Sequence, residues 1–156
     1  MPNAFFIVTL SLLFIYIGVR VAPFIGKIAY RRRIKRSGID DITDGHDFEL
    51  FVVNLLKENG FKNIKTTPKT GDYGADVLAS LDGEKYAVQC KLYSKSVGIK
   101  AVQEIFAAMQ YYECDVAAVA TNNKFSKNAV NLADSTGVLL WDRDALIEMS
   151  RIHRIQ

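Results

Sequence analysis

Apolar side chains along the chain follow two different periods, and these periods predict helices and strands in a definite order. Between Asp44 and Asn59 apolar residues recur at helical spacing, with Phe48, Val52 and Leu55 among them. The same spacing returns over residues 99–112, whereas residues 116–121, VAAVAT, form a short continuous apolar run typical of a buried strand. Helices are therefore expected over 44–59, 99–112 and 126–135 and after 142, and strands over 62–67, 75–81, 84–93, 116–121 and 138–141.

The dipeptide Asp82-Gly83 predicts the register of a β-hairpin. A two-residue Asp-Gly connection favours a type I′ turn, so residues 81 and 84 form the first pair. Continued outward, this register places Asp76 opposite Gln89, with Lys91 two residues further along the second strand. Opposed residues project to the same face, so these three side chains are expected together. The opposite face is apolar and is expected to pack in the core; it holds Val77, Ala79, Leu81, Tyr86, Val88 and Cys90.

The N-terminal run Ala4–Val19 is uncharged and apolar, and its 16 residues would reach ~24 Å as a helix, against ~30 Å of bilayer hydrocarbon. Extension through Arg20 to Gly26 makes it long enough, because an arginine near a helix end can reach the headgroups. All nearby basic residues follow the run, whereas a signal peptide usually has them before it. We therefore interpret residues 1–36 as an anchor and basic juxtamembrane segment, in preference to a signal peptide or a buried helix.

Charge divides the chain at the same place. Residues 1–36 hold seven Lys/Arg and no Asp/Glu, and residues 37–156 hold 13 Lys/Arg against 17 Asp/Glu, which gives net charges of +7 and −4. The positive-inside rule then predicts a single-pass protein of the cell membrane, with its N-terminus outside and residues 37–156 in the cytoplasm. The basic segment suits anionic membrane lipid. A mildly acidic domain must bind nucleic acid through local site chemistry, because its bulk charge does not favour phosphate.

Several other classes of chemistry lack their sequence signals. The loop Gly71-Asp72-Tyr73-Gly74 has the wrong spacing for a Walker phosphate loop, a GxSxG elbow or a Rossmann fingerprint, so no nucleotide cofactor is expected. The two cysteines and two histidines show no zinc-ligand spacing. The polar face of the predicted hairpin is therefore the remaining candidate for a functional site.

Over residues 40–150 the chain resembles a known family. The order of elements, with Glu49 in the first globular helix and Gly74-Ala75-Asp76 followed by Gln89-Cys90-Lys91, is similar to the Mrr-like catalytic domain of type IV restriction enzymes, in the PD-(D/E)xK nuclease superfamily. The resemblance implies an α/β, restriction-endonuclease-like mixed β-sheet flanked by helices, here preceded by one N-terminal transmembrane helix. It also implies a DNA endonuclease that depends on Mg²⁺, with Mn²⁺ as the alternative, and that acts in defence against foreign DNA.

The site residues fit that chemistry one by one. Phosphodiester hydrolysis needs a hard cation with oxygen ligands, for which Asp76, Gln89 and Glu49 are the candidates. Gln89 stands where an acidic ligand is more common, but its amide oxygen remains a ligand. Lys91 is expected to position or help deprotonate the attacking water and to oppose charge on the phosphate. Gln103, in the second globular helix, either faces the site and binds substrate or faces water.

Simpler interpretations stand beside these roles. Asp76 could be a solvated hairpin aspartate, Glu49 a carboxylate that complements its helix N-terminus, and Lys91 an exposed strand lysine. For the whole chain the alternatives are a catalytically silent, membrane-tethered binding or scaffolding domain, and a structure-selective repair nuclease or resolvase on the same fold. The sequence leaves a homodimer open.

Overall fold

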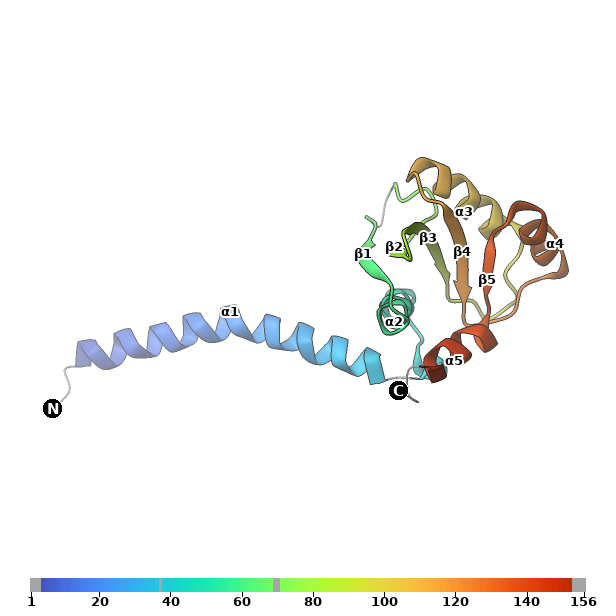
Figure 1. Ribbon diagram of the computed structural model, residues 1–156. Helices are drawn as coiled ribbons and strands as arrows, with labels where there is room; N and C mark the ends of the chain where they lie inside the picture. The colour runs from blue at the N-terminus through green and yellow to red at the C-terminus, as the bar shows by residue number, and fades with distance from the viewer. Residues whose placement is uncertain (1–3, 37, 69–70, 153–156) are drawn as a thin grey trace. The chain divides into compact units, whose positions relative to one another are not determined.

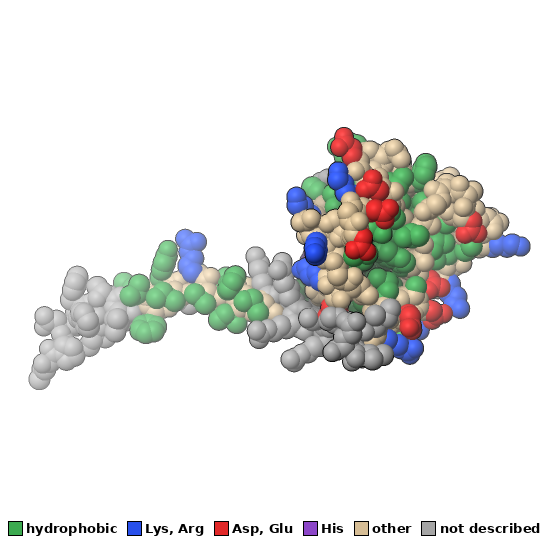
Figure 2. Space-filling view, in the orientation of Figure 1, with side chains coloured by type: hydrophobic (Ala, Val, Ile, Leu, Met, Phe, Trp, Pro, Cys, Tyr) green, Lys and Arg blue, Asp and Glu red, His purple; other side chains and the backbone are tan. Residues whose placement is uncertain are grey.

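The computed structural model of the protein describes residues 4–36, 38–68 and 71–152 and divides into two units, Met1–Arg36 and Ser37–Gln156. The first unit is one helix, α1 (Ala4–Arg36), which continues through Pro23 and the basic segment. Within it the window Leu12–Tyr30 has 19 residues and a mean hydropathy of 1.7, and none of the window is buried. Figure 2 shows apolar side chains along the described part of this helix. By length and composition, α1 is therefore a candidate membrane span.

The second unit is built on a five-stranded mixed sheet in the order β1-β2-β3-β4-β5 (Figure 1). The first three strands pair antiparallel, whereas β3, β4 and β5 run parallel to one another. The parallel connections contain helices, as the geometry of a crossover requires. The strands are β1 (Lys62–Thr66), β2 (Val77–Leu81), β3 (Glu84–Lys91), β4 (Val116–Thr121) and β5 (Leu139–Trp141).

Helices cover both faces of the sheet, and each face has its own apolar core. One core joins Phe48 and Val52 of α2 (Gly45–Glu58) and Leu146 of α5 (Arg143–Ile152) to the sheet. The other core lies under α3 (Ile99–Tyr111) and α4 (Lys127–Thr136). A 3-10 turn, η1 (Ile39–Asp41), precedes α2. The expected mixed sheet flanked by helices is confirmed.

Side-chain caps fix where several helices begin. The Asp44 carboxylate accepts the N–H groups of His46 and Asp47 at the start of α2. Ser126 and Asp142 likewise accept the backbone N–H groups of Ala129 and Ala145 at the starts of the two expected helices that follow them. Such caps satisfy N–H groups that have no partner within the helix. Because they are local, the sequence predicted these starts to within a residue.

The hairpin between β2 and β3 has the expected register. Asp82 and Gly83 have φ values of +51° and +93°, as a type I′ turn requires at both central positions. Pairing proceeds from Leu81 with Glu84 to Val77 with Val88. All six apolar residues predicted for the core face belong to the cluster under α2 and α5. The ladder ends one residue short of the expected pair of Asp76 with Gln89, because the Asp76 N–H donates to the carbonyl of Val88.

Candidate active site

Asp76 directly precedes β2, and both its backbone N–H and its backbone carbonyl form hydrogen bonds. Its N–H donates to the Val88 carbonyl over 2.9 Å, and its own carbonyl accepts the N–H of Thr67 over 3.0 Å. Its side-chain Oδ2 accepts the backbone N–H of Cys90 at 2.6 Å. Cys90 is the residue between Gln89 and Lys91, so the carboxylate lies beside the part of β3 that carries both predicted partners.

Gln89 and Lys91 are two residues apart on β3 and meet at a common acceptor, Glu104 of α3. The Gln89 Nε2 donates to Glu104 Oε2 over 2.9 Å, and the Lys91 Nζ lies 3.3 Å from the same oxygen. The backbone of Lys91 is fixed as well, because the Thr121 hydroxyl of β4 donates to its carbonyl over 2.7 Å. Neighbouring strands and one helix thus hold both side chains in place.

The Gln89 amide is the most informative group of the cluster. Gln89 is only 1% exposed, and its Oε1 is buried with no hydrogen-bond partner among the described residues. A buried oxygen without a donor is costly, typically by ~1–3 kcal/mol. The amide nitrogen of Gln89 already donates to Glu104, so the amide oxygen is the atom that can still bind another group. Such an oxygen suits a cation or a substrate donor.

The Glu104 carboxylate supplies the negative charge that pairs with Lys91 and the oxygen that accepts the hydrogen bond from Gln89. Burial raises its pKa, but the hydrogen bond from Gln89 and the charge of Lys91 outweigh burial, so the Glu104 pKa is lowered from its ordinary value. Lys100, one turn earlier on α3, lies 3.6 Å from its other oxygen. Glu104 therefore stays ionised at neutral pH and anchors the ammonium of Lys91.

Sequence reasoning named Gln103 on α3, and the structure places its neighbour Glu104 at the cluster. The Gln103 side chain is exposed and lies outside the contacts that join Gln89 and Lys91. The buried residues Ala101 and Ala108 of α3 stand three before and four after Glu104. Residues at these offsets share a helix face, so the apolar spacing of α3 is the signal that could have identified Glu104, which the sequence prediction missed.

Glu49 projects from α2 toward the same region. Its carboxylate lies 3.5 Å from Nδ1 of His46, and its negative charge contributes to the raised pKa of Asp76. The four residues predicted for the site are thus brought together in two ways. Gln89 and Lys91 share Glu104, whereas Asp76 and Glu49 interact through their charges.

Asp76 has an unusual ionisation for a carboxylate. Burial is the largest cause and raises its pKa from 3.8 to about 6, with the charges of Glu49 and Asp72 adding to the effect. The Cys90 N–H and the charge of Lys91 oppose the shift. An added cation would offset the same burial and repulsion, so Asp76 is a carboxylate that gains from a positive ligand.

The oxygen donors present fit a hard divalent cation. Among the residues that the structure describes, no three His, Cys, Asp or Glu side chains form a metal-binding group. The fit instead combines the Asp76 carboxylate with the bare Oε1 of Gln89, both oxygen ligands of the kind that Mg²⁺ prefers. Mg²⁺ usually keeps several waters, so two or three protein ligands are enough.

Replacing Asp76 with asparagine is expected to stabilise the metal-free protein at alkaline pH. The folded-state pKa of Asp76 is raised, so its contribution to stability is complete below pH 3.8 and is lost as the pH rises through about 6. An uncharged amide avoids that loss while its oxygen can still accept the Cys90 N–H. Thermal unfolding should show a higher midpoint for Asp76→Asn at pH 8, with the difference vanishing near pH 4.

Adding Mg²⁺ serves as the control for this comparison. A ligand that binds only the folded state raises the unfolding midpoint. Mg²⁺ should therefore stabilise the parent protein more than Asp76→Asn. Equal midpoints at pH 8, or equal shifts with Mg²⁺, would contradict the assignment of Asp76 as a buried cation ligand.

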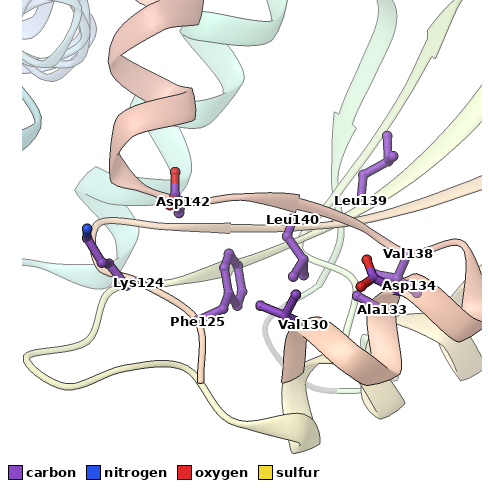
Figure 3. Close-up of a pocket in the computed structure, with 9 residues that line it drawn as sticks. All are labelled: Lys124, Phe125, Val130, Ala133, Asp134, Val138, Leu139, Leu140 and Asp142. Atoms are coloured by element: carbon purple, nitrogen blue, oxygen red, sulfur yellow. The ribbon is translucent and has the colours of Figure 1, made fainter. Parts of the chain in front are cut away.

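A separate hollow of about 490 Å³ lies between α4 and β5, away from these residues. The side chains of Phe125, Val130 and Leu140 face one another there (Figure 3). Two of its three charged residues have local partners, since Asp142 caps α5 and Lys124 lies 4.0 Å from Asp144, and the third, Asp134, is exposed. The hollow offers no buried polar group without a partner among the described residues, so the cluster of Asp76, Gln89 and Lys91 remains the candidate site.

The fold is that of a restriction-endonuclease-like domain, and comparison with known proteins gives the same result. Residues 40–150 match the Mrr_cat restriction endonuclease family, and the chain belongs to this family. The type IV methyl-directed restriction enzyme EcoKMrr of Escherichia coli (strain K12) is 28% identical over a 110-residue alignment, which covers 65% of this chain and 36% of that enzyme. The recognition of an Mrr-like catalytic domain from sequence is confirmed.

Two solved structures resemble the fold. The crystal structure of a protein of unknown function, AF1548, aligns with a TM-score of 0.53 and 27% identity, covering 64% of this chain and 62% of that one. The DNA modification-dependent restriction endonuclease AspBHI aligns with a TM-score of 0.56 and 16% identity, covering 78% of this chain and 33% of that one. The chain thus spans about a third of the length of either named restriction enzyme.

Proposed function

We propose that the protein is a membrane-anchored, Mg²⁺-dependent endodeoxyribonuclease that hydrolyses phosphodiester bonds and acts in restriction of foreign DNA. The observation that carries this proposal is the buried Oε1 of Gln89, which has no hydrogen-bond partner in the described part of the chain and lies on the strand beside the Asp76 carboxylate and Lys91. Membership of a restriction endonuclease family supports DNA as the substrate.

Asp76 and Gln89 would hold the cation, with Glu49 supporting it by charge. When bound, Mg²⁺ supplies positive charge that stabilises the transferring phosphate and makes water more acidic. Lys91 keeps its ammonium at the site through Glu104, where it can orient the attacking water and oppose charge on the phosphate. Glu104 positions both side chains, because removing it would leave Gln89 Nε2 and Lys91 Nζ without their shared acceptor.

Changing Gln89 to glutamate is expected to keep part of the activity and to shift the preferred metal. The variant has a similar size and restores an acidic ligand, but it loses the amide that donates to Glu104 and places two carboxylates close together. Cleavage rates measured across a series of Mg²⁺ and Mn²⁺ concentrations test this. An unchanged metal profile would argue that Oε1 of Gln89 does not face the cation, and Gln103→Glu, on the exposed face of α3, is the matched control.

The anchor gives the second part of the proposal. We infer that α1 spans the membrane once with its N-terminus outside, because no basic residue precedes Arg20 and the other six basic residues of α1 follow it. A reporter fused after Gln156 should therefore be active in the cytoplasm, and the protein should resist carbonate extraction. A reporter active outside the cytoplasm would overturn this orientation and would separate the domain from chromosomal DNA.

Tethering at the membrane would restrict which DNA the domain meets. Acidic and basic side chains are interspersed on the face of the domain shown in Figure 2, and residues 37–156 have a net charge of −4. Nonspecific affinity for DNA comes mainly from neutralised phosphates, so the isolated domain should bind DNA weakly and lose affinity steeply with added salt. DNA that enters through the membrane is the substrate such a protein would encounter first.

A further inference from the structure

Beside the candidate site lies a pair of tyrosines that the proposed chemistry does not use. Tyr73, from the loop before β2, and Tyr111, at the end of α3, have ring centroids 4.0 Å apart with a tilt of 36°. Tyr112 meets Tyr111 edge to face at 5.0 Å. Despite the contact, Tyr73 is 58% and Tyr111 is 59% exposed. Each ring therefore keeps surface open to a further planar group.

The loop that carries Tyr73 is bound to the site itself. Its next residue, Gly74, approaches α3 so closely that a Cβ there would lie 2.9 Å from Cβ of Glu104 and 3.2 Å from Nε2 of Gln89. Glu104 and Tyr111 are seven residues apart, two helical turns on one face of α3, which corresponds to about 10 Å. The tyrosine pair is thus within a few nucleotides of the catalytic cluster, given ~3.4 Å per nucleotide along a stacked strand.

The backbone holds Tyr73 in an unusual conformation. Its φ is +51°, between Gly71 at +76° and Gly74 at +99°, and side chains rarely adopt such values. The Asp72 side chain fixes the turn by accepting the N–H of Gly74 over 3.1 Å. Strained backbone of this kind persists where the surroundings enforce it, and it is frequent at functional sites.

We propose that Tyr73 and Tyr111 form a stacking platform for an unpaired DNA base, so that the preferred substrate has unpaired nucleotides beside the scissile phosphate. This inference rests on the proposed nuclease function and specifies its substrate. Bases within a duplex are covered by their neighbours, so a surface aromatic pair can stack only on a single-stranded, frayed or extruded base. The side-chain interaction with Tyr73 raises the pKa of Tyr111, so that phenol stays uncharged at neutral pH and does not repel phosphate.

Binding of fluorescent oligonucleotides to the full-length protein in detergent tests this, with Asp76→Asn in every variant to prevent cleavage. The parent is expected to prefer a single strand over the duplex of the same sequence. Tyr73→Ala and Tyr111→Leu should weaken single-strand affinity by roughly 5- to 140-fold, the range for loss of one stacked base, and leave duplex affinity nearly unchanged. Tyr73→Phe should bind the single strand like the parent, because the aromatic ring provides the stacking and the hydroxyl does not.

Abasic oligonucleotides sharpen the comparison. Removing one base at a time should weaken binding by the parent at one or two positions, and should have no further effect in Tyr73→Ala. Leu139→Ala, which removes a 41% exposed apolar side chain from β5, is the matched control and should bind like the parent. The inference fails if Tyr73→Ala and Tyr111→Leu bind the single strand like the parent, or if they instead change the association state in light scattering.

These failures are distinguishable from failure of the proposed function. If the tyrosine variants bind normally while Asp76→Ala abolishes cleavage, the nuclease stands and the stacking platform is wrong. If no protein cleaves DNA but the tyrosine variants still lose single-strand affinity, the stacking platform is supported and the domain binds DNA without cleaving it.

Discussion

Replacing Asp76 or Lys91 with alanine is expected to lower the rate of DNA cleavage by at least about 100-fold, the effect typical of losing a catalytic acid, base or charge-stabilising group. Asp76 is the charged oxygen ligand of the proposed cation site, and Lys91 is the cation held next to it by Glu104. The fold should persist, because Asp76 precedes β2, Lys91 ends β3, and neither belongs to an apolar core. Single-turnover cleavage and circular dichroism provide the two measurements.

Matched controls separate site chemistry from general loss of charge. Asp134 on α4 and Lys62 on β1 are exposed residues of the same types. Asp134→Ala and Lys62→Ala should cleave at rates close to the parent. Full activity in Asp76→Ala or Lys91→Ala would remove that residue from the active site, and equal losses in the controls would point to DNA binding by overall charge.

Replacing Gly74 with alanine is expected to be nearly as damaging, although Gly74 has no chemistry of its own. The new Cβ would lie 2.9 Å from Cβ of Glu104 and 3.2 Å from Nε2 of Gln89, so the side chains of the site must move. The φ of +99° adds backbone strain of about 1–3 kcal/mol. Since a displacement of ~1 Å at a reacting centre can cost about 100-fold in rate, cleavage should fall by that order.

Gly71→Ala is the natural comparison, because it shares the strain without the contact. Gly71 has a φ of +76°, and a Cβ there would meet nothing within 4 Å. It should lower the thermal midpoint and leave the cleavage rate of the folded protein close to the parent's. If Gly71→Ala loses as much cleavage as Gly74→Ala, the loop acts through its conformation and the close approach to Glu104 is unimportant.

The sequence predicted the features that depend on neighbouring residues. The Asp82-Gly83 turn set the hairpin register because its two positive φ values leave few alternatives. Asp44, Ser126 and Asp142 marked helix starts through side chains that bond to N–H groups two or three residues away. The apolar alternation of β2 and β3 identified the face packed under α2 and α5.

Features set by distant contacts were harder to predict. The hairpin ladder stops before Asp76 because Thr67 and Val88 bind its backbone and Cys90 binds its side chain. The role of Glu104 depends on α3 packing against β3, which places it on Gln89 and Lys91 from 15 and 13 residues away. The bare oxygen of Gln89 follows from that packing too, since Glu104 selects which end of the amide is satisfied.

The most direct test of the central claim is DNA cleavage by the full-length protein in liposomes and by residues 37–156 alone. Both should be assayed on linear, nicked, methylated and branched DNA, with Mg²⁺ or Mn²⁺ and with a chelator, at low salt. We predict that both proteins cleave at least one of these substrates with a divalent ion and that the chelator abolishes cleavage. Cleavage that persists undiminished with the chelator, or no cleavage by either protein under every metal and salt condition, would contradict a metal-dependent nuclease site at Asp76, Gln89 and Lys91.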